Sequence, residues 1–334
     1  MQDINGIRHR FNRFKKRLIS PQQLEKIRSS ILQESTININ YIVLIIGSCI
    51  IATFGLLSNS AAVIIGAMII APLMLPVRGL AFGALEGNTV LFRKALTAII
   101  IGTILSIALA WFISYFVALP EFSSEIISRS RPTLLDLGIA VAAGGISGFA
   151  KVQPKISESL AGTAIAVALM PPVCVIGLGL SQLNLSLSVG ATLLYLTNLL
   201  GITLSCMLTF LLTGCTSLKR AKKALGWTLA FTAILLIPLS VSFVELIRQN
   251  RLEASLRQAL LNRTITFQRM VMLDSSVNWL TNPPEVRLNV RAKQPVTPTQ
   301  VILLEQFLAK EMGQHFTLIF EVGKIEEVRR DNPL

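Results

Sequence analysis

Prolines inside long uncharged stretches are the residues of this chain with the clearest chemical consequence. Ala71-Pro72 and Pro76, and later Pro171 and Pro172, stand among small apolar residues. Proline removes one helix hydrogen bond and frees a carbonyl, which within hydrocarbon requires a partner or a water-lined cavity. The pattern favours a substrate or ion pathway built on two broken helices. The alternative interpretation is a pair of proline kinks that only shape helix packing.

Three polar side chains join these prolines as pathway candidates. Arg78 is either a counter-charge for an anionic solute or a side chain that extends to the inner membrane interface. Asp136 is either an ion or proton group in the membrane or the acidic member of a capping box with Thr133. Asn198 lies within an apolar segment, where an amide binds either a substrate or a neighbouring helix. The full candidate set is Ala71, Pro72, Pro76, Arg78, Asp136, Pro171, Pro172 and Asn198.

Sequence signatures of enzymes and metal sites are missing. The two histidines, His9 and His315, lie outside the apolar segments, and the four cysteines form no CxxC pair. The sequence also lacks the GxSxG, HExxH and P-loop motifs. We therefore expect no catalytic residues, no metal, no cofactor and no enzymatic activity.

Composition places the chain in a membrane. Of its 334 residues, 52% are hydrophobic and 15% are charged, against roughly a quarter charged in soluble domains. The net charge of +13 would suggest nucleic acid for a soluble chain, but here the Lys and Arg residues flank uncharged runs. We expect a lipid bilayer and no nucleic acid as partner. The uncharged runs are 41–77, 95–120, 159–218 and 224–244.

The length of these runs predicts seven transmembrane helices. A helix rises about 1.5 Å per residue and the hydrocarbon is about 30 Å thick, so the first and third runs must each turn once. Connections on the N-terminal side carry 17 Lys and Arg residues and those on the other side carry two, which places the N-terminus in the cytoplasm. The expected spans are 41–57, 60–76, 95–119, 134–150, 160–181, 187–213 and 224–245.

An internal repeat groups six of these spans. The sequence AMIIAP at 67–72 is similar to AVALMP at 166–171, at an offset of 99 residues. Each copy lies in the second span of a group of three, which divides the region into repeats over 41–119 and 134–214. Because three is odd, the second group must enter the membrane from the opposite face, as in inverted 3+3 transporter folds. We expect the two broken helices to meet near the midplane.

The ends of the chain differ from this membrane region. Residues 1–40 form a basic amphipathic segment whose first helix lies on an anionic leaflet or packs on the membrane domain. A second helix is expected to start at Ser20-Pro21, with Leu24, Ile27 and Ile31 on one face. Beyond the additional helix at 224–245, residues 248–334 predict a small soluble α/β domain. Its expected elements are a helix at 248–263, strands at 266–273 and 285–292, a helix at 298–312 and a strand at 316–323.

Several motifs resemble one known family. They are Ser60–Met74, Arg131–Asp136, Ala142–Gly145, Ala164–Pro172 and Asn198. In this order they are similar to the prokaryotic "uncharacterised hydrophobic domain" family, domain of unknown function number 389, over about residues 40–214. Many members carry a soluble N-terminal domain in place of the basic segment, and Arg78 stands where they have an apolar residue. The resemblance implies a polytopic membrane protein and supplies no substrate.

These observations predict an all-α polytopic membrane protein of about seven transmembrane helices with a 3+3 inverted repeat, plus a small C-terminal soluble α/β domain. We expect a channel or secondary transporter for a small solute or ion. The alternative is a membrane scaffold or regulatory subunit that binds protein partners through 248–334. Small residues at four-residue spacing can seal helix contacts within one chain or in a homo-oligomer. The expected location is the prokaryotic inner (plasma) membrane, with a thylakoid or other internal membrane as the alternative.

Overall fold

The computed structural model describes residues 19–117, 122–153, 169–216, 218–263, 270–278, 283–292 and 296–324. The basic helix expected within residues 4–18 lies outside this set. The chain divides into two compact units, Met1–Phe243 and Val244–Leu334. The first unit is made of helices, and the second contains a small β-sheet.

The first unit has the helices of a membrane protein. Five helices in the described ranges are long and apolar enough to cross a bilayer, and a bent pair, α4 (Ala61–Ile70) and α5 (Met74–Glu86), passes the same test together. Helix α10 (Met170–Ser181) is apolar but shorter, and residues 154–168 before it lie outside the described set, so the expected fifth span at 160–181 stays a prediction. The five helices are α3 (Ile39–Leu57), α6 (Thr89–Val117), α8 (Leu134–Val152), α11 (Leu185–Leu212) and the Ala221–Val241 part of α12 (Leu218–Arg263).

The expected second span was wrong in its end point. The chain forms α4 (Ala61–Ile70), a break where the sequence predicted one, and α5 (Met74–Glu86), which continues ten residues beyond the expected end at 76. Pro76 lies in the first turn of α5, where a missing N–H removes no helix bond, so it does not stop the helix. The helix stops at Gly87, whose φ of 72° suits glycine.

Short polar caps define where the helices begin. Helix α2 (Pro21–Glu34) starts with the expected Ser20-Pro21 pair, and Ser20 forms a capping box with Gln23. The Asn38 side chain caps α3 by accepting from the Tyr41 amide at 2.8 Å. These local bonds use amide groups that a helix itself leaves unpaired.

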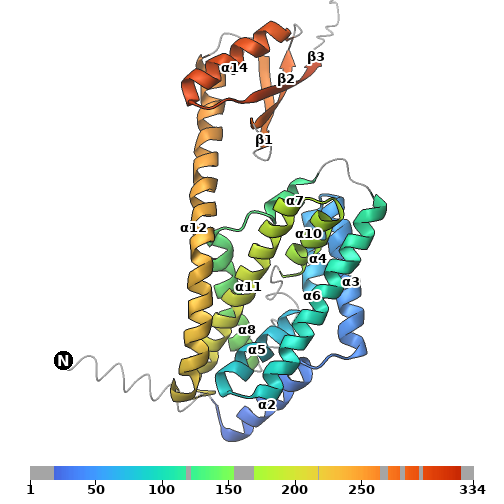
Figure 1. The fold of residues 1–334 in the computed structure, drawn as a ribbon, viewed down its shortest axis with the longest axis vertical. Coiled ribbons are helices and arrows are strands. Elements are labelled where there is room, and N and C mark those ends of the chain that lie inside the picture. The colour runs from blue at the N-terminus through green and yellow to red at the C-terminus, as the bar shows by residue number, and fades with distance from the viewer. Residues whose placement is uncertain are drawn as a thin grey trace, which may run out of the picture. The chain divides into compact units, whose positions relative to one another are not determined.

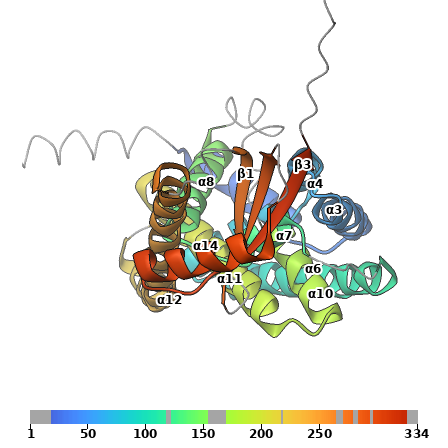
Figure 2. The same cartoon turned by 90° about the horizontal axis from the view of Figure 1, so that it is seen from above.

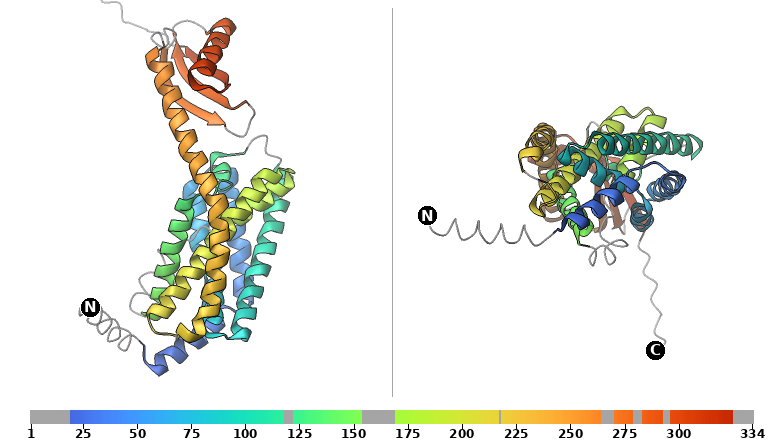
Figure 3. Two further views of the ribbon diagram at one scale, coloured as in Figure 1. Left: turned by 60° about the vertical axis from the view of Figure 1, so that its left-hand side comes forward. Right: turned by 90° about the horizontal axis from the view of Figure 1, so that it is seen from below.

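Helix α2 lies across one end of the helical unit, and α7 (Ser124–Ser128) lies at the opposite end (Figures 1 and 3). Helix α5 extends to the α2 end, whereas α10 (Met170–Ser181) lies at the α7 end (Figure 1). The Ser123 hydroxyl anchors the start of α7 by donating to the Leu56 carbonyl at 2.7 Å. The two short apolar helices that follow the proline motifs thus point to opposite ends of the unit.

Two turns of the unit repeat the same hydrogen bonds 96 residues apart. The Asn88 amide donates to the Gly83 carbonyl at 2.9 Å, and the Asn184 amide donates to the Gly179 carbonyl at 2.9 Å. Each asparagine side chain then caps the following helix, at 3.1 Å before α6 and 3.0 Å before α11. Helices α3 and α8 both have 19 residues, and α6 and α11 have 29 and 28.

The two similar turns differ in offset from the two proline motifs. At an offset of 96 residues, Pro172 takes the place of Pro76, whereas the sequence pattern paired Pro72 with Pro171 at an offset of 99. The position equivalent to Pro72 is then 168, which lies outside the described residues. The internal repeat, and with it the pairing of Pro72 with Pro171, stays a prediction.

The helices interlock across the unit. Helix α10 packs against α6 and α3, and α5 packs against α11. A Cβ on Gly177 of α10 would lie 2.5 Å from the Ile107 carbonyl oxygen of α6, so these backbones nearly touch. On the other pair, the rings of Phe82 and Phe210 meet edge to face with centroids 5.2 Å apart. Both contacts join a helix from before residue 118 to one from after residue 169.

The second unit is a three-stranded sheet with a helix on one side (Figure 2). Strand β2 is central, antiparallel to β1 and parallel to β3. Alternate β2 residues Val286, Leu288 and Val290 are buried with Leu304 and Leu308 of the helix. The expected strand at 266–273 was wrong in its end point, since the pairing with β2 continues to 278, and its first residues, 266–269, lie outside the described ranges. The elements are β1 (Met270–Asn278), β2 (Glu285–Ala292), α14 (Pro298–Met312) and β3 (Thr317–Lys324).

Candidate functional site

The break between α4 and α5 begins at the predicted Ala71-Pro72 pair. The Ala71 amide closes α4 on the Ala67 carbonyl at 3.1 Å, and Ala71 itself is extended. Pro72 has no N–H to offer the Met68 carbonyl, so the helix cannot continue. The Leu75 amide donates to the Pro72 carbonyl at 3.1 Å and starts α5, with a bend of 50° between the two helices.

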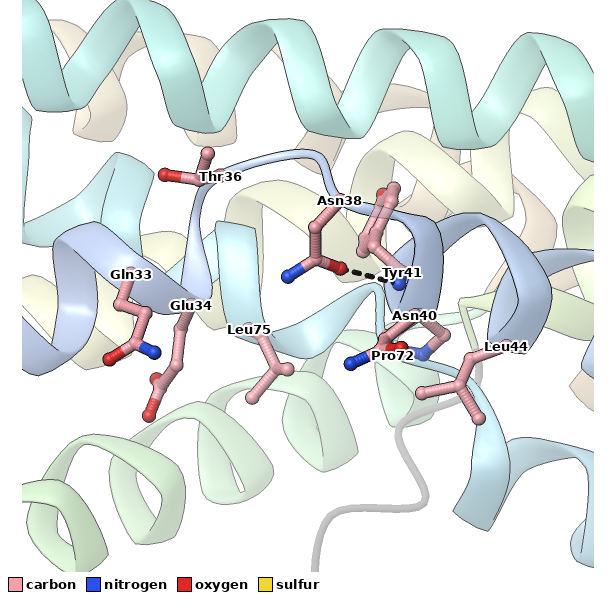
Figure 4. Close-up of a pocket in the computed structure, with 9 residues that line it drawn as sticks. All are labelled: Gln33, Glu34, Thr36, Asn38, Asn40, Tyr41, Leu44, Pro72 and Leu75. Atoms are coloured by element: carbon pink, nitrogen blue, oxygen red, sulfur yellow. Dashed lines mark hydrogen bonds between the residues drawn. The ribbon is translucent and has the colours of Figure 1, made fainter.

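A cavity of about 230 Å³ lies beside this break. Figure 4 shows Gln33 and Glu34 on one side of Leu75 and Asn38, Asn40 and Pro72 on the other. The cavity is therefore polar along the end of α2 and the link to α3, and apolar at the break. Its volume is sufficient for several waters or a small solute. The lining residues are Gln33, Glu34, Thr36, Asn38, Asn40, Tyr41, Leu44, Pro72 and Leu75.

Arg78 lies one turn beyond the break and is buried, with 9% of its side chain exposed. One terminal nitrogen, Nη2, donates to Glu34 Oε2 at 3.2 Å. Its Nε is buried without a hydrogen-bond partner among the described residues. The counter-charge of Arg78 in the structure is therefore a carboxylate of the same chain, and its place at the inner membrane interface stays a prediction.

Lys151 brings a second, largely buried cation to the same carboxylate. Its Nζ contacts Glu34 Oε1 and donates to the Ser30 hydroxyl at 2.7 Å. The side chains of Lys151 and Glu34 are 12% and 23% exposed. Glu34 of α2 thus bridges α5 and α8, with each carboxylate oxygen assigned to one cation. This buried cluster of two cations and one anion carries a net positive charge.

A second ion pair holds α2 against the end of α5. Arg28 Nε donates to Glu86 Oε2 at 3.0 Å and Arg28 Nη2 donates to Glu86 Oε1 at 2.9 Å. Hydrogen bonding to the Glu86 carboxylate, together with its charge, raises the pKa of Arg28 above its ordinary value. This pair is bidentate, the geometry in which a guanidinium and a carboxylate satisfy each other best.

The other predicted residues lie away from the cavity lining. Asp136 Oδ2 accepts from the amide and hydroxyl of Thr133 at 2.7 and 2.8 Å, so Asp136 forms the capping box that its spacing indicates. Pro171 and Pro172 are buried in the first turn of α10, and Asn198 is buried in α11. The meeting of two broken helices stays a prediction, because the chain before α10 lies outside the described residues.

Sequence reasoning missed Glu34 and Lys151. A signal for Glu34 exists, because it follows Ile27 and Ile31 at helical spacing and so continues the buried face of α2. Lys151 was counted only as one of the positive charges on the inner side. No local pattern links the two residues, which are 117 positions apart.

Metal ligands do not gather in the described part of the chain. Within those ranges, no group of three or more His, Cys, Asp or Glu side chains is placed to hold a metal ion. What the site offers is charge and hydrogen bonding: a buried guanidinium, a buried ammonium, a bridging carboxylate and a polar cavity next to a helix break. These groups can bind and release a charged or polar solute.

Comparison with known proteins gives a family and one relative. A family model described as "Domain of unknown function (DUF389)" matches residues 68–204. An uncharacterised protein of the archaeon Methanocaldococcus jannaschii is 30% identical over 215 residues, which cover 64% of this chain and 66% of the relative. No solved structure matches the chain.

Proposed function

The chain belongs to the family described as Domain of unknown function (DUF389), and from its structure we propose that it is a membrane channel or secondary transporter for a small solute or ion. The observation that carries this proposal is the break at Ala71-Pro72 with a cavity of about 230 Å³ beside it. In membrane proteins, interrupted helices are tolerated where the freed backbone lines a cavity, and transporters build their binding sites from them. The proposal assigns the chain no enzymatic reaction.

An inverted 3+3 repeat is part of the proposal. It is supported by the turns at Asn88 and Asn184, which repeat the same hydrogen bonds, and by the matching lengths of α3 with α8 and α6 with α11. The positions of α5 and α10 at opposite ends of the unit also favour it (Figure 1). Two interlocked three-helix repeats can rock against each other, which exposes a shared binding site first to one side of the membrane and then to the other.

The proposed orientation follows from the charged end of the unit. Arg28, Arg78 and Lys151 all lie where α2 crosses the helices. Because Lys and Arg favour the cytoplasmic side, we place α2 and the N-terminus in the cytoplasm of a prokaryotic cell, with the chain in the plasma membrane. A protein partner for 248–334 and a homo-oligomer are further proposals that the expected bilayer function does not require.

Flux through proteoliposomes tests the proposed function. The purified full chain would be reconstituted into liposomes. Light scattering would follow the entry of glycerol and of four potassium salts: the chloride, acetate, sulfate and phosphate. We expect at least one solute to enter faster than into protein-free liposomes. Pro72→Ala restores an N–H that can bond the Met68 carbonyl, and it should lower that rate at least tenfold.

The matched control for this variant is Gly66→Ala. Gly66 lies in α4, and a Cβ there would meet nothing within 4 Å, so this variant should keep the wild-type rate. A Pro72→Ala rate equal to wild type would exclude the break from the pathway. If no solute enters and the chain purifies with a fixed protein partner, the scaffold alternative replaces transport.

A further inference from the structure

The Arg78 cluster contains more donors than its carboxylate can satisfy. The adjacent donors of Arg78 are Nε and Nη2, and Lys151 Nζ points to the same carboxylate. Glu34 has two oxygens, of which Oε2 takes Nη2 and Oε1 takes Lys151. Arg78 Nε is therefore left buried without a partner in the described part of the chain. A buried unpaired donor on a charged group is destabilising by more than an ordinary lost hydrogen bond.

Arg28 of the same chain shows an arginine whose Nε and Nη2 donors both have a carboxylate partner. Arg28 uses Nε and Nη2 together to hold both oxygens of Glu86, at 3.0 and 2.9 Å. Glu34 does not adopt this geometry on Arg78, because its Oε1 accepts from both Lys151 Nζ and the Ser30 hydroxyl. A ligand that offers a separate oxygen to each of the three donors has at least three acceptor oxygens held close together.

We propose that Arg78 and Lys151 form a binding site for a tetrahedral oxyanion, such as sulfate or a phosphate group, and that Glu34 fills this site as a tethered ligand when the oxyanion is absent. Three of four oxyanion oxygens suffice for Arg78 Nε, Arg78 Nη2 and Lys151 Nζ. Arginine edges are suited to such bidentate recognition. This inference rests on the proposed transport function for its solute class, although binding itself is measured separately.

Charge and position support the exchange. Two buried cations with one carboxylate carry a net charge of +1, and a divalent oxyanion in place of Glu34 would neutralise both cations. Glu34 also lines the cavity beside the break, so its carboxylate has space into which it can withdraw. Since Arg78 belongs to α5 and Lys151 to α8, release of Glu34 from one cation or both frees two helices that it now ties to α2.

Binding is tested by thermal unfolding of the purified full chain in a neutral detergent, titrated with sodium sulfate. Glu34→Gln removes the competing carboxylate, so sulfate should raise its unfolding temperature with a half-saturating concentration at least tenfold below that of wild type. Sodium chloride at equal ionic strength should not reproduce this shift. The matched control is Glu25→Gln, on the same helix with the same charge change but a side chain that is 70% exposed, which should titrate like wild type.

A second variant, Glu34→Asp, tests the site even if Glu34→Gln does not fold. Glu34→Asp retains the charge but shortens the side chain, and it should also bind sulfate more tightly than wild type. Adding Lys151→Gln to either variant should weaken sulfate binding at least tenfold. Equal sulfate dependence in wild type, Glu34→Gln and Glu34→Asp would overturn the site.

The same measurement distinguishes a free oxyanion from the phosphate group of a lipid. Stabilisation by free sulfate or phosphate in lipid-free detergent identifies a soluble ion. Stabilisation of Glu34→Gln only in nanodiscs that contain phosphatidylglycerol, compared with phosphatidylcholine alone, identifies a lipid phosphate at the same cations.

If sulfate binds but no solute crosses proteoliposomes, the oxyanion site is supported and the transport proposal fails. If glycerol or chloride crosses and neither sulfate, phosphate nor phosphatidylglycerol stabilises any Glu34 variant, transport survives and the oxyanion site fails.

Discussion

A methyl group added at Gly144 should force α8 away from α11. A Cβ at this position would lie 2.5 Å from the Ile202 carbonyl oxygen and 2.8 Å from the Ile202 Cα. Both are backbone atoms of a fully buried residue, so no side-chain rotation can relieve the contact. The helices must separate by several tenths of an ångström, and overpacking of this kind destabilises by about 1–3 kcal/mol.

Gly138 on the same helix provides the comparison. A Cβ there would meet nothing within 4 Å. In both Gly144→Ala and Gly138→Ala the backbone loses less conformational entropy on folding, which stabilises each variant by about 0.5–1 kcal/mol. This contribution cancels when the two variants are compared. The free energy of unfolding should therefore be about 1–3 kcal/mol lower for Gly144→Ala than for Gly138→Ala. Reversible unfolding of the full chain in mixed detergent micelles, followed by circular dichroism, measures this difference.

A local readout accompanies the stability measurement. Cys206 of α11 is buried, and its Sγ lies 3.1 Å from the Gly144 carbonyl oxygen. Separation of the helices should expose this thiol, so maleimide labelling at Cys206, located by mass spectrometry, should accelerate in Gly144→Ala alone. Equal stability and equal labelling in the two variants would refute the close packing of α8 on α11.

Three further predictions concern caps and the second unit. Asn88→Ala and Asn184→Ala each remove a helix cap and should each lower the unfolding free energy by about 1 kcal/mol, and unfolding curves that change for one variant alone would contradict their equivalence. Asp136→Ala should lose about 0.3–1 kcal/mol of stability with unchanged flux per folded molecule in proteoliposomes, whereas loss of flux in a stable variant would make Asp136 a pathway residue. Leu308→Ala opens a cavity under the sheet and should destabilise the second unit by about 2–5 kcal/mol, seen as faster proteolysis within Val244–Leu334 while the helical unit stays intact; unchanged proteolysis would argue against this core.

Local signals were sufficient where a helix is defined by its own caps. The helix at 298–312 matches α14 in both bounds because Thr297 and Pro298 start it and Gly313, with a φ of 66°, ends it. The start of α2 at Pro21 follows from the same kind of bond between Ser20 and Gln23. Such bonds join residues three positions apart, so a short stretch of sequence is sufficient to predict them.

Long-range contacts explain what the sequence did not predict. The bridge from Glu34 to Lys151 joins residues 117 positions apart, and neither residue belongs to a motif. The wrong end of the second span has a different cause: Pro76 was taken as part of a break, although a proline in the first turn of a helix is compatible with it. The sequence left two interpretations for Arg78, a counter-charge for an anionic solute or a side chain at the inner interface. It did not predict the ion pair with Glu34, because the two residues are 44 positions apart.

The packing of α10 against α3 and α6 also sets an order of events on the ribosome. Helix α10 ends 64 residues after α6, and synthesis at about 5–20 residues per second separates the two by roughly 3–13 s. During this interval the newly inserted α3 and α6 lack α10, whose Gly177 lets its backbone approach α6 closely. Lipid or a membrane insertase must occupy the place of α10 until it arrives, and the half-made protein is then most vulnerable to membrane proteases.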